Sequence, residues 1–325
     1  MKAIKFFAIS AMAAAMITSC SSEDELSQSN YPSDNIIRVT AGVNNAKTRA
    51  EGAGTEMKKD FSLTIVNKNA SKYTYTDKVF SKSSGDWACS ETLLWQKSDA
   101  LVDIVAFAPA QTGKFNGVYA NGSIQPIAYS VASDQSTASD NNDLLYYYAK
   151  DFNPGESLDK GKLNIQFNHA FCMIDIVVTL GTEFNKPEVL KESPIVKVTL
   201  GGTKIAANVD VTNAASVVTV SGEATATDIT TTNGSFTTAA DPEKNAISRF
   251  SCIAIPQKVA SNTFKVSLMT AGKRYEWTSD KEITLQSGYR YTLNLSMGND
   301  VVLLKGGSIS ATKWTEVSGG SLETD

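Results

Sequence analysis

Residues 36–43, Ile-Ile-Arg-Val-Thr-Ala-Gly-Val, decide the fold, because apolar and solvent-compatible side chains alternate along them. Successive side chains of a β-strand point to opposite faces, so Ile37, Val39, Ala41 and Val43 share one face. We therefore expect a strand that covers a hydrophobic core with this face. Near the other end of the chain, residues 289–296 alternate in the same way.

Short apolar runs separated by turn-forming residues continue along the chain, and no long amphipathic helix interrupts them. Its 325 residues suit two domains of about 150 residues each. The pattern predicts an all-β protein with two β-sandwich domains in tandem. The break at Asn153-Pro154-Gly155 places the boundary, giving an N-terminal domain at 36–155 and a C-terminal domain at 156–325.

Three segments carry more specific expectations. Residues 110–142 are rich in Gly, Asn, Ser and Asp and predict a long loop with turns. Residues 163–180 are apolar and β-branched, which favours one long, bent strand that opens the second domain. Asn233-Gly234 is a strong hairpin-turn signal.

The composition argues against catalysis, metal binding and nucleic-acid binding. A formal net charge of −4 excludes a broad basic surface for nucleic acid. The single histidine, His169, lies between aromatic residues without a nucleophile motif, so we expect a structural residue whose ring nitrogens bond the backbone. Asp99 with Asp103, and Asp140 with Asp143, lack a calcium-loop pattern and predict solvated loop charges. We expect no enzyme activity and no cofactor.

The cysteines and tryptophans can be either core residues or functional ones. Cys172 and Cys252 lie in apolar runs and predict small buried side chains, whereas Cys89 leaves an odd number of thiols. Four tryptophans could line a sugar-binding face if they are exposed and coplanar, and otherwise belong to the core: Trp87, Trp95, Trp277 and Trp314.

The N-terminus predicts export. Lys2 and Lys5 precede an apolar stretch that is too short to span a bilayer, and Ile17-Thr18-Ser19-Cys20 resembles the lipobox of bacterial lipoproteins. The resemblance implies removal of a signal peptide, residues 1–19, and acylation of Cys20. Residues 20–35 then form an acidic and polar tether, whose first residues resemble an export signal for the outer face of the outer membrane.

A second processing site follows the first expected strand. Lys47-Thr48-Arg49-Ala50 leads into Glu51-Gly52-Ala53-Gly54, a small and polar stretch. An arginine in an exposed loop suits a trypsin-like, arginine-specific protease, although an arginine without a role remains the alternative.

These segments, in this order, resemble the fimbrillin family of pilus subunits. The residues on which this resemblance rests are Cys20, Thr48-Arg49, Val102 to Pro109, Asp143-Leu144-Leu145-Tyr146, Leu163 to Ala170, Gly288 to Leu293, and Ile309 to Trp314. The resemblance implies two transthyretin-like, Greek-key sandwiches and a structural, adhesive subunit of a cell-surface fimbria. It further implies that the precursor is anchored at the outer membrane by its lipid and is cleaved after Arg49. The strand that carries Ile37, Val39, Ala41 and Val43 is then lost, and a strand of another pilus subunit replaces it.

The sequence does not decide whether this chain donates a strand to a neighbouring subunit, so two assembly positions remain open. Candidate donor residues are Val302, Leu304, Ile309 and Ala311. If residues 309–314 belong to the chain's own sheet, no spare donor remains, and the resemblance then implies a tip or accessory subunit. The rival hypothesis is a monomeric surface lipoprotein that binds glycans on a β-sandwich face.

Overall fold

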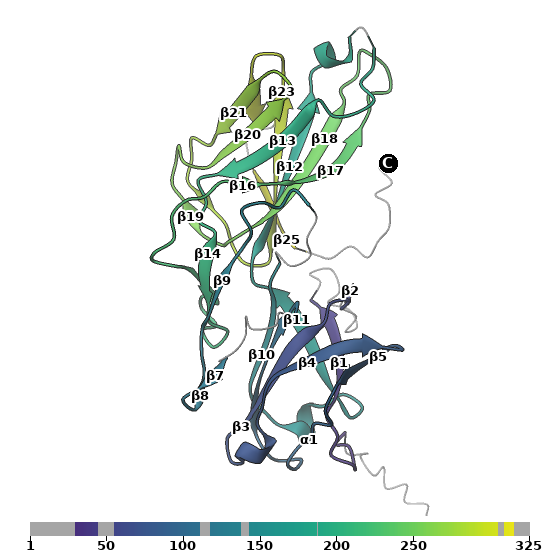
Figure 1. Ribbon diagram of the computed structural model, residues 1–325, viewed down its shortest axis with the longest axis vertical. Helices are drawn as coiled ribbons and strands as arrows, with labels where there is room; N and C mark the ends of the chain where they lie inside the picture. Colours follow the sequence, from purple (N-terminus) through teal and green to yellow (C-terminus); the bar gives the residue numbers. More distant parts are fainter. Residues whose placement is uncertain are drawn as a thin grey trace, which may run out of the picture.

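The protein is almost entirely β-structure, as expected. The computed structural model describes residues 30–44, 55–110, 118–137, 143–186, 188–304 and 309–314. Within them the helical elements are short: α1 (Pro154–Ser157) and the 3-10 turns η1 (Ser71–Tyr73) and η3 (Thr182–Asn185). None of the described helices is long and apolar enough to cross a membrane. Figure 1 shows two lobes joined near β10 and β11.

The N-terminal lobe is one sheet in the order β2-β1-β11-β10-β6-β3-β4-β5. Its strands are β1 (Arg38–Val43), β2 (Thr55–Glu56), β3 (Phe61–Asn67), β4 (Tyr75–Ser83), β5 (Asp86–Cys89), β6 (Val102–Ala108), β10 (Leu145–Phe152) and β11 (Lys162–His169). The sheet curls so that the residues before β1 meet the chain that follows β5: the Ile37 N–H donates to the Leu93 carbonyl (2.9 Å), and the Trp95 N–H donates to the Asn35 carbonyl (2.8 Å). The curl encloses a hydrophobic core that includes Phe61 and Phe167.

The C-terminal lobe holds a second and larger core between several sheets. One sheet runs β17-β18-β12-β23-β24, with β25 also paired to β23, and another runs β16-β13-β20-β21. The strands are β12 (Cys172–Leu180), β13 (Ile195–Gly201), β16 (Ile229–Thr230), β17 (Thr232–Thr237), β18 (Ile247–Ala254), β20 (Lys265–Thr270), β21 (Arg274–Thr278), β23 (Tyr289–Met297), β24 (Val302–Leu304) and β25 (Ser310–Lys313). A short pair, β19 (Lys258–Val259) with β22 (Ile283–Thr284), lies beside them.

Residues 118–137 leave the N-terminal sheet between β6 and β10 and pack on the other lobe. After the hairpin of β7 (Tyr119–Ala120) and β8 (Ser123–Ile124), strand β9 (Ile127–Ser130) pairs with β14 (Ala206–Val209), which pairs in turn with β15 (Val218–Val220). The buried Gln135 side chain donates to the Ile253 carbonyl (2.9 Å) and accepts from its N–H (2.8 Å). The stretch expected as a loop thus contains a strand and is part of the C-terminal lobe.

The chain also crosses between lobes later than expected. Residues 163–180 form two strands, because β11 pairs with β1 and β10 whereas β12 pairs with β18 and β23. The change of sheet falls at Ala170-Phe171, both fully buried, and not at residue 155. The ranges 36–155 and 156–325 therefore do not coincide with the lobes, and the Greek-key, transthyretin-like detail stays a prediction.

Candidate functional site

The first strand, β1, is a structural part of the N-terminal core. Ile37, Val39 and Val43 are 4–6% exposed and Ala41 packs against the same cluster. The alternation in the sequence thus places its apolar face as expected. Solvent-facing Arg38 and Thr40 lie on the opposite face.

β1 pairs extensively with one neighbouring strand and only briefly with the other. It pairs in parallel with β11 along its full length, from Arg38 opposite Lys162 to Val43 opposite Phe167. On its other side the short β2 pairs with only Gly42 and Val43. Past the end of β1, the Asn44 N–H donates to the Phe167 carbonyl (2.8 Å). We call the space that β1 fills between β11 and β2 the β1 slot.

The chain enters β1 through a charged turn. The Asp34 carboxylate accepts bonds from the Arg38 guanidinium (2.6 and 3.0 Å) and from the Ile36 N–H (3.1 Å). These bonds lower the pKa of Asp34 from 3.8 to about 2. The turn is exposed, so solvent screens most of this interaction.

The two expected processing residues, Cys20 and Arg49, lie outside the described residues. Their positions in the chain relative to β1 are nevertheless defined. Cys20 precedes the first described residue, Asn30, and Arg49 falls between Asn44 and β2.

The candidate donor residues lie at an edge of the C-terminal lobe. β24 pairs with the end of β23, Leu304 opposite Leu295, and β25 pairs with its beginning, Ala311 opposite Tyr291. Val302 is buried and Ile309 half-buried, whereas all four side chains of β25 are exposed. In this structure both segments pair with the chain's own sheet.

A buried aromatic contact secures β25 where the lobes meet. The Trp314 ring stacks on the His169 ring, with centroids 3.8 Å apart. The backbone N–H of Trp314 donates to the Gly288 carbonyl (2.7 Å). Nδ1 of His169 lies 2.9 Å from the Asp143 carboxylate. His169 is therefore a buried packing residue, as expected, although its ring bonds a carboxylate.

The remaining candidate residues do not converge on a site. Asp99 is exposed and pairs with Lys97 (3.0 Å), whereas Asp103 lies in β6 and pairs with Lys68 (3.1 Å). Asp143 is buried, so the expectation of solvated loop charges is wrong for Asp103 and Asp143, while Asp140 lies outside the described residues. The described part of the chain contains no cluster of three or more side chains that could hold a metal. Cys172 and Cys252 are buried, as expected, and their burial raises the pKa of both thiols. Cys89 is half-buried.

The tryptophans form no exposed face. Trp95 and Trp314 are buried; Trp87 and Trp277 are half-buried against Phe61 (4.9 Å) and Phe264 (6.4 Å). The expected core placement is thus confirmed for two of them, and the other two pack on core rings.

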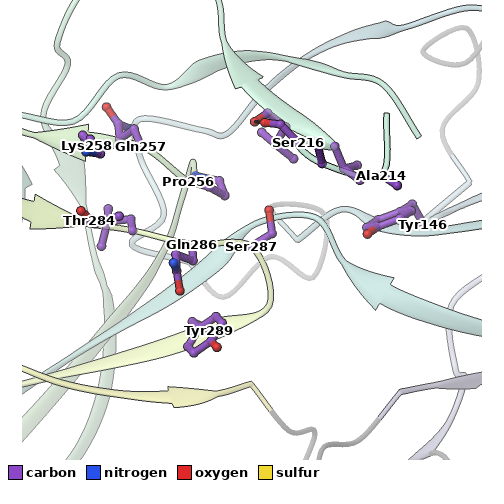
Figure 2. A pocket seen from close by; sticks show the side chains of 14 residues that line it. Tyr146, Ala214, Ser216, Pro256, Gln257, Lys258, Thr284, Gln286, Ser287 and Tyr289 are labelled. Carbon is purple, nitrogen blue, oxygen red and sulfur yellow. Dashed lines mark hydrogen bonds between the residues drawn. The ribbon is translucent and has the colours of Figure 1, made fainter. Parts of the chain in front are cut away.

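A groove of about 540 Å³ lies beside the joint of the lobes. Figure 2 shows Tyr146 of β10 at one end and Lys258 at the other, with Gln286, Ser287 and Tyr289 between them. Local sequence patterns do not reveal this groove. Its lining comes from distant segments, including 214–218, 256–258 and 284–289.

Comparisons with known proteins identify a family from the sequence and similar folds among solved structures. The sequence profile described as fimbrillin-like matches residues 48–314. The fold is similar to putative cell adhesion proteins from Bacteroides ovatus (15% identity, 87% of this chain and 98% of that chain, TM-score 0.59) and Bacteroides uniformis (14%, 87% and 100%, 0.55). It is also similar to a fimbrial protein from Bacteroides vulgatus (16%, 86% and 98%, 0.52). No curated protein matches the chain.

Proposed function

Because the chain belongs to the fimbrillin-like family, we propose that it is a structural and adhesive subunit of a cell-surface fimbria that assembles by strand exchange. In this proposal Cys20 is acylated, and the lipid holds the precursor at the outer membrane until an arginine-specific protease cuts after Arg49. Cleavage frees β1 to leave its slot together with the lipid. The observation that carries the proposal is the burial of Ile37, Val39 and Val43 in the N-terminal core.

The energetics of β1 favour exchange over simple loss. Burying each of its three apolar side chains is worth about 1.5–3 kcal/mol, so an empty slot forfeits about 5–9 kcal/mol. That equals much of the stability of an ordinary domain, about 5–15 kcal/mol. An incoming strand restores both the core contacts and the ladder hydrogen bonds along β11.

The arginines support Arg49 as the cleavage site. The chain has five arginines, and four of them lie in strands: Arg38, Arg249, Arg274 and Arg290. A protease binds its substrate as an extended, accessible segment, which a paired strand does not offer. The fifth arginine, Arg49, lies outside the described residues, and we propose it as the cleavage site because the other four are held in strands.

The C-terminal strands favour a tip or accessory position. β24 and β25 pair with β23, and Trp314 anchors β25 at the joint of the lobes. We therefore propose a subunit that accepts a strand in its β1 slot and donates none. Neither half-buried Trp87 nor Trp277 favours the rival tryptophan-lined glycan face.

The test is digestion of the purified mature chain with an arginine-specific endoprotease. We expect one cut after Arg49, followed by uptake of a fluorescent peptide of residues 36–44 into a complex that survives unheated SDS electrophoresis. Arg49→Gln should abolish both results, and the matched Lys47→Gln variant should retain them. A cut chain that neither releases its N-terminal fragment nor takes up the peptide contradicts strand exchange.

A second peptide, residues 301–314, tests the assembly position. An accepting subunit takes up the 36–44 peptide, and the cut protein forms no ladder of its own. Uptake of the 301–314 peptide together with a ladder of SDS-resistant oligomers would contradict the tip or accessory position and indicate a stalk subunit.

A further inference from the structure

The groove beside the joint of the lobes has the chemistry of a carbohydrate site, and its walls are fixed before any ligand binds. Tyr291 is buried, and its hydroxyl bonds the Thr284 carbonyl (3.0 Å) and the Gln286 N–H (2.8 Å). The Leu285 N–H donates to the Gln257 carbonyl (2.9 Å) and the Gly288 N–H to the Phe171 carbonyl (2.8 Å). Preformed walls reduce the entropy that ligand binding costs.

Two other segments of the lining, 256–258 and 214–218, are tied down in the same manner. The Gln257 side chain donates to the Lys204 and Ile255 carbonyls (2.9 and 3.0 Å) and accepts from the Lys204 N–H (2.9 Å). The Ser216 hydroxyl donates to the Val218 carbonyl (3.2 Å). These two polar side chains therefore maintain the shape of the groove.

Other polar side chains of the lining are left for a ligand. Among the described residues nothing hydrogen-bonds the side chains of Tyr146, Gln286, Ser287 or Tyr289. They supply two phenolic hydroxyls, one carboxamide and one alcohol, which both donate and accept hydrogen bonds. Burial raises the pKa of Tyr146, so its phenol stays protonated at neutral pH.

The lining is almost uncharged. Its single charged side chain, Lys258, has its ammonium 3.7 Å from the Glu282 carboxylate. Tyrosine rings pack against apolar C–H surfaces, and amide and hydroxyl groups bond alcohols without requiring a charge. About 540 Å³ falls within the size range of small-ligand pockets. From these features we infer that the groove binds a neutral carbohydrate, with Gln286, Ser287 and Tyr289 as its central contacts (Figure 2).

This inference is independent of strand exchange, because it concerns the C-terminal lobe of the intact chain. The test uses the uncut mature protein on an array of neutral hexose and N-acetylhexosamine oligosaccharides, with sialylated and sulfated oligosaccharides as a second arm. We expect binding on the neutral arm. Gln286→Ala and Tyr289→Ala should each weaken it at least tenfold, as measured by titration calorimetry with the best neutral oligosaccharide.

The controls separate binding from folding. Gln286 is exposed, so its replacement should leave the melting temperature unchanged, and Tyr73→Ala alters a half-buried tyrosine far from the groove lining. The Tyr73 variant should bind as the wild type does. No binding on either arm, binding confined to acidic glycans, or equal binding by the groove variants and the wild type would each overturn the inference.

Discussion

β1 and β25, the first and last strands that the structure describes, are held in opposite ways. β1 lies inside a sheet between β11 and β2 and buries three apolar side chains, Ile37, Val39 and Val43. β25 lies along β23, exposes all four of its side chains and depends on the adjacent Trp314. The difference teaches that hydrogen-bonded pairing alone does not make a strand part of a core. Removing β1 would take three buried side chains out of the N-terminal core, whereas the four side chains of β25 are all exposed.

The largest effect should come from a charge on the buried face of β1. Val39→Asp places a carboxylate in an apolar core without a partner, and we expect a loss of about 4 kcal/mol or more in the free energy of unfolding. Urea titration followed by tryptophan fluorescence measures it. Thr40→Asp puts the same charge on the exposed face of the same strand and should cost less than about 1 kcal/mol. Equal losses would show that β1 is not held by its apolar face.

A smaller effect is expected at the other end of the chain. Trp314→Ala removes the ring that stacks on His169 and should lower the free energy of unfolding by about 3 kcal/mol, the usual cost of deleting a buried aromatic side chain. Lys313→Ala changes an exposed neighbour and should be neutral within about 0.5 kcal/mol in the same denaturation experiment. A Trp314 variant as stable as wild type would remove the anchor assigned to β25.

Hydrogen exchange should distinguish the two strands without any mutation. Opening β25 uncovers few apolar groups, so its amides should exchange by local opening at least about tenfold faster than those of β1. Mass spectrometry of peptic fragments that span 36–43 and 309–314 measures the difference. Protection of β25 that equals or exceeds that of β1 would reverse the comparison.

The smallest expected effect lies at the entry to β1. The pKa of Asp34 is lowered to about 2, chiefly by its hydrogen bonds with Arg38. Its contribution to stability is therefore complete above about pH 4 and is lost as the pH falls towards 2. Asp34→Asn should shift the melting temperature by no more than about 2 °C at pH 7, since the pair is exposed. The shift should shrink steadily as the pH falls through about 2; one that grows on acidification would have the wrong sign.

Local patterns in the sequence predicted strands and faces well. The alternation at 36–43 matches β1, and the alternation at 289–296 matches β23, where Tyr291, Leu293 and Leu295 are buried. These features depend on backbone geometry and on the period of two, which act within a few residues.

Local patterns failed where distant segments compete. Asn233-Gly234 predicted a hairpin turn, yet both residues lie within β17, at an irregularity opposite β18. A Cβ atom on Gly234 would lie 2.8 Å from the Arg249 carbonyl oxygen, so the glycine permits a close backbone approach there. The carbohydrate groove was likewise beyond prediction, because its lining joins segments far apart in the chain.

By itself the sequence determined the all-β class, the buried face of β1 and the core character of Cys172 and Cys252. Only the tertiary structure decided that β9 joins β14, that β11 stays with β1, and that β25 closes against β23. The physical reason is that alternation specifies which face of a strand is apolar, while its partner depends on packing between cores. A strand's neighbours are chosen by the whole fold.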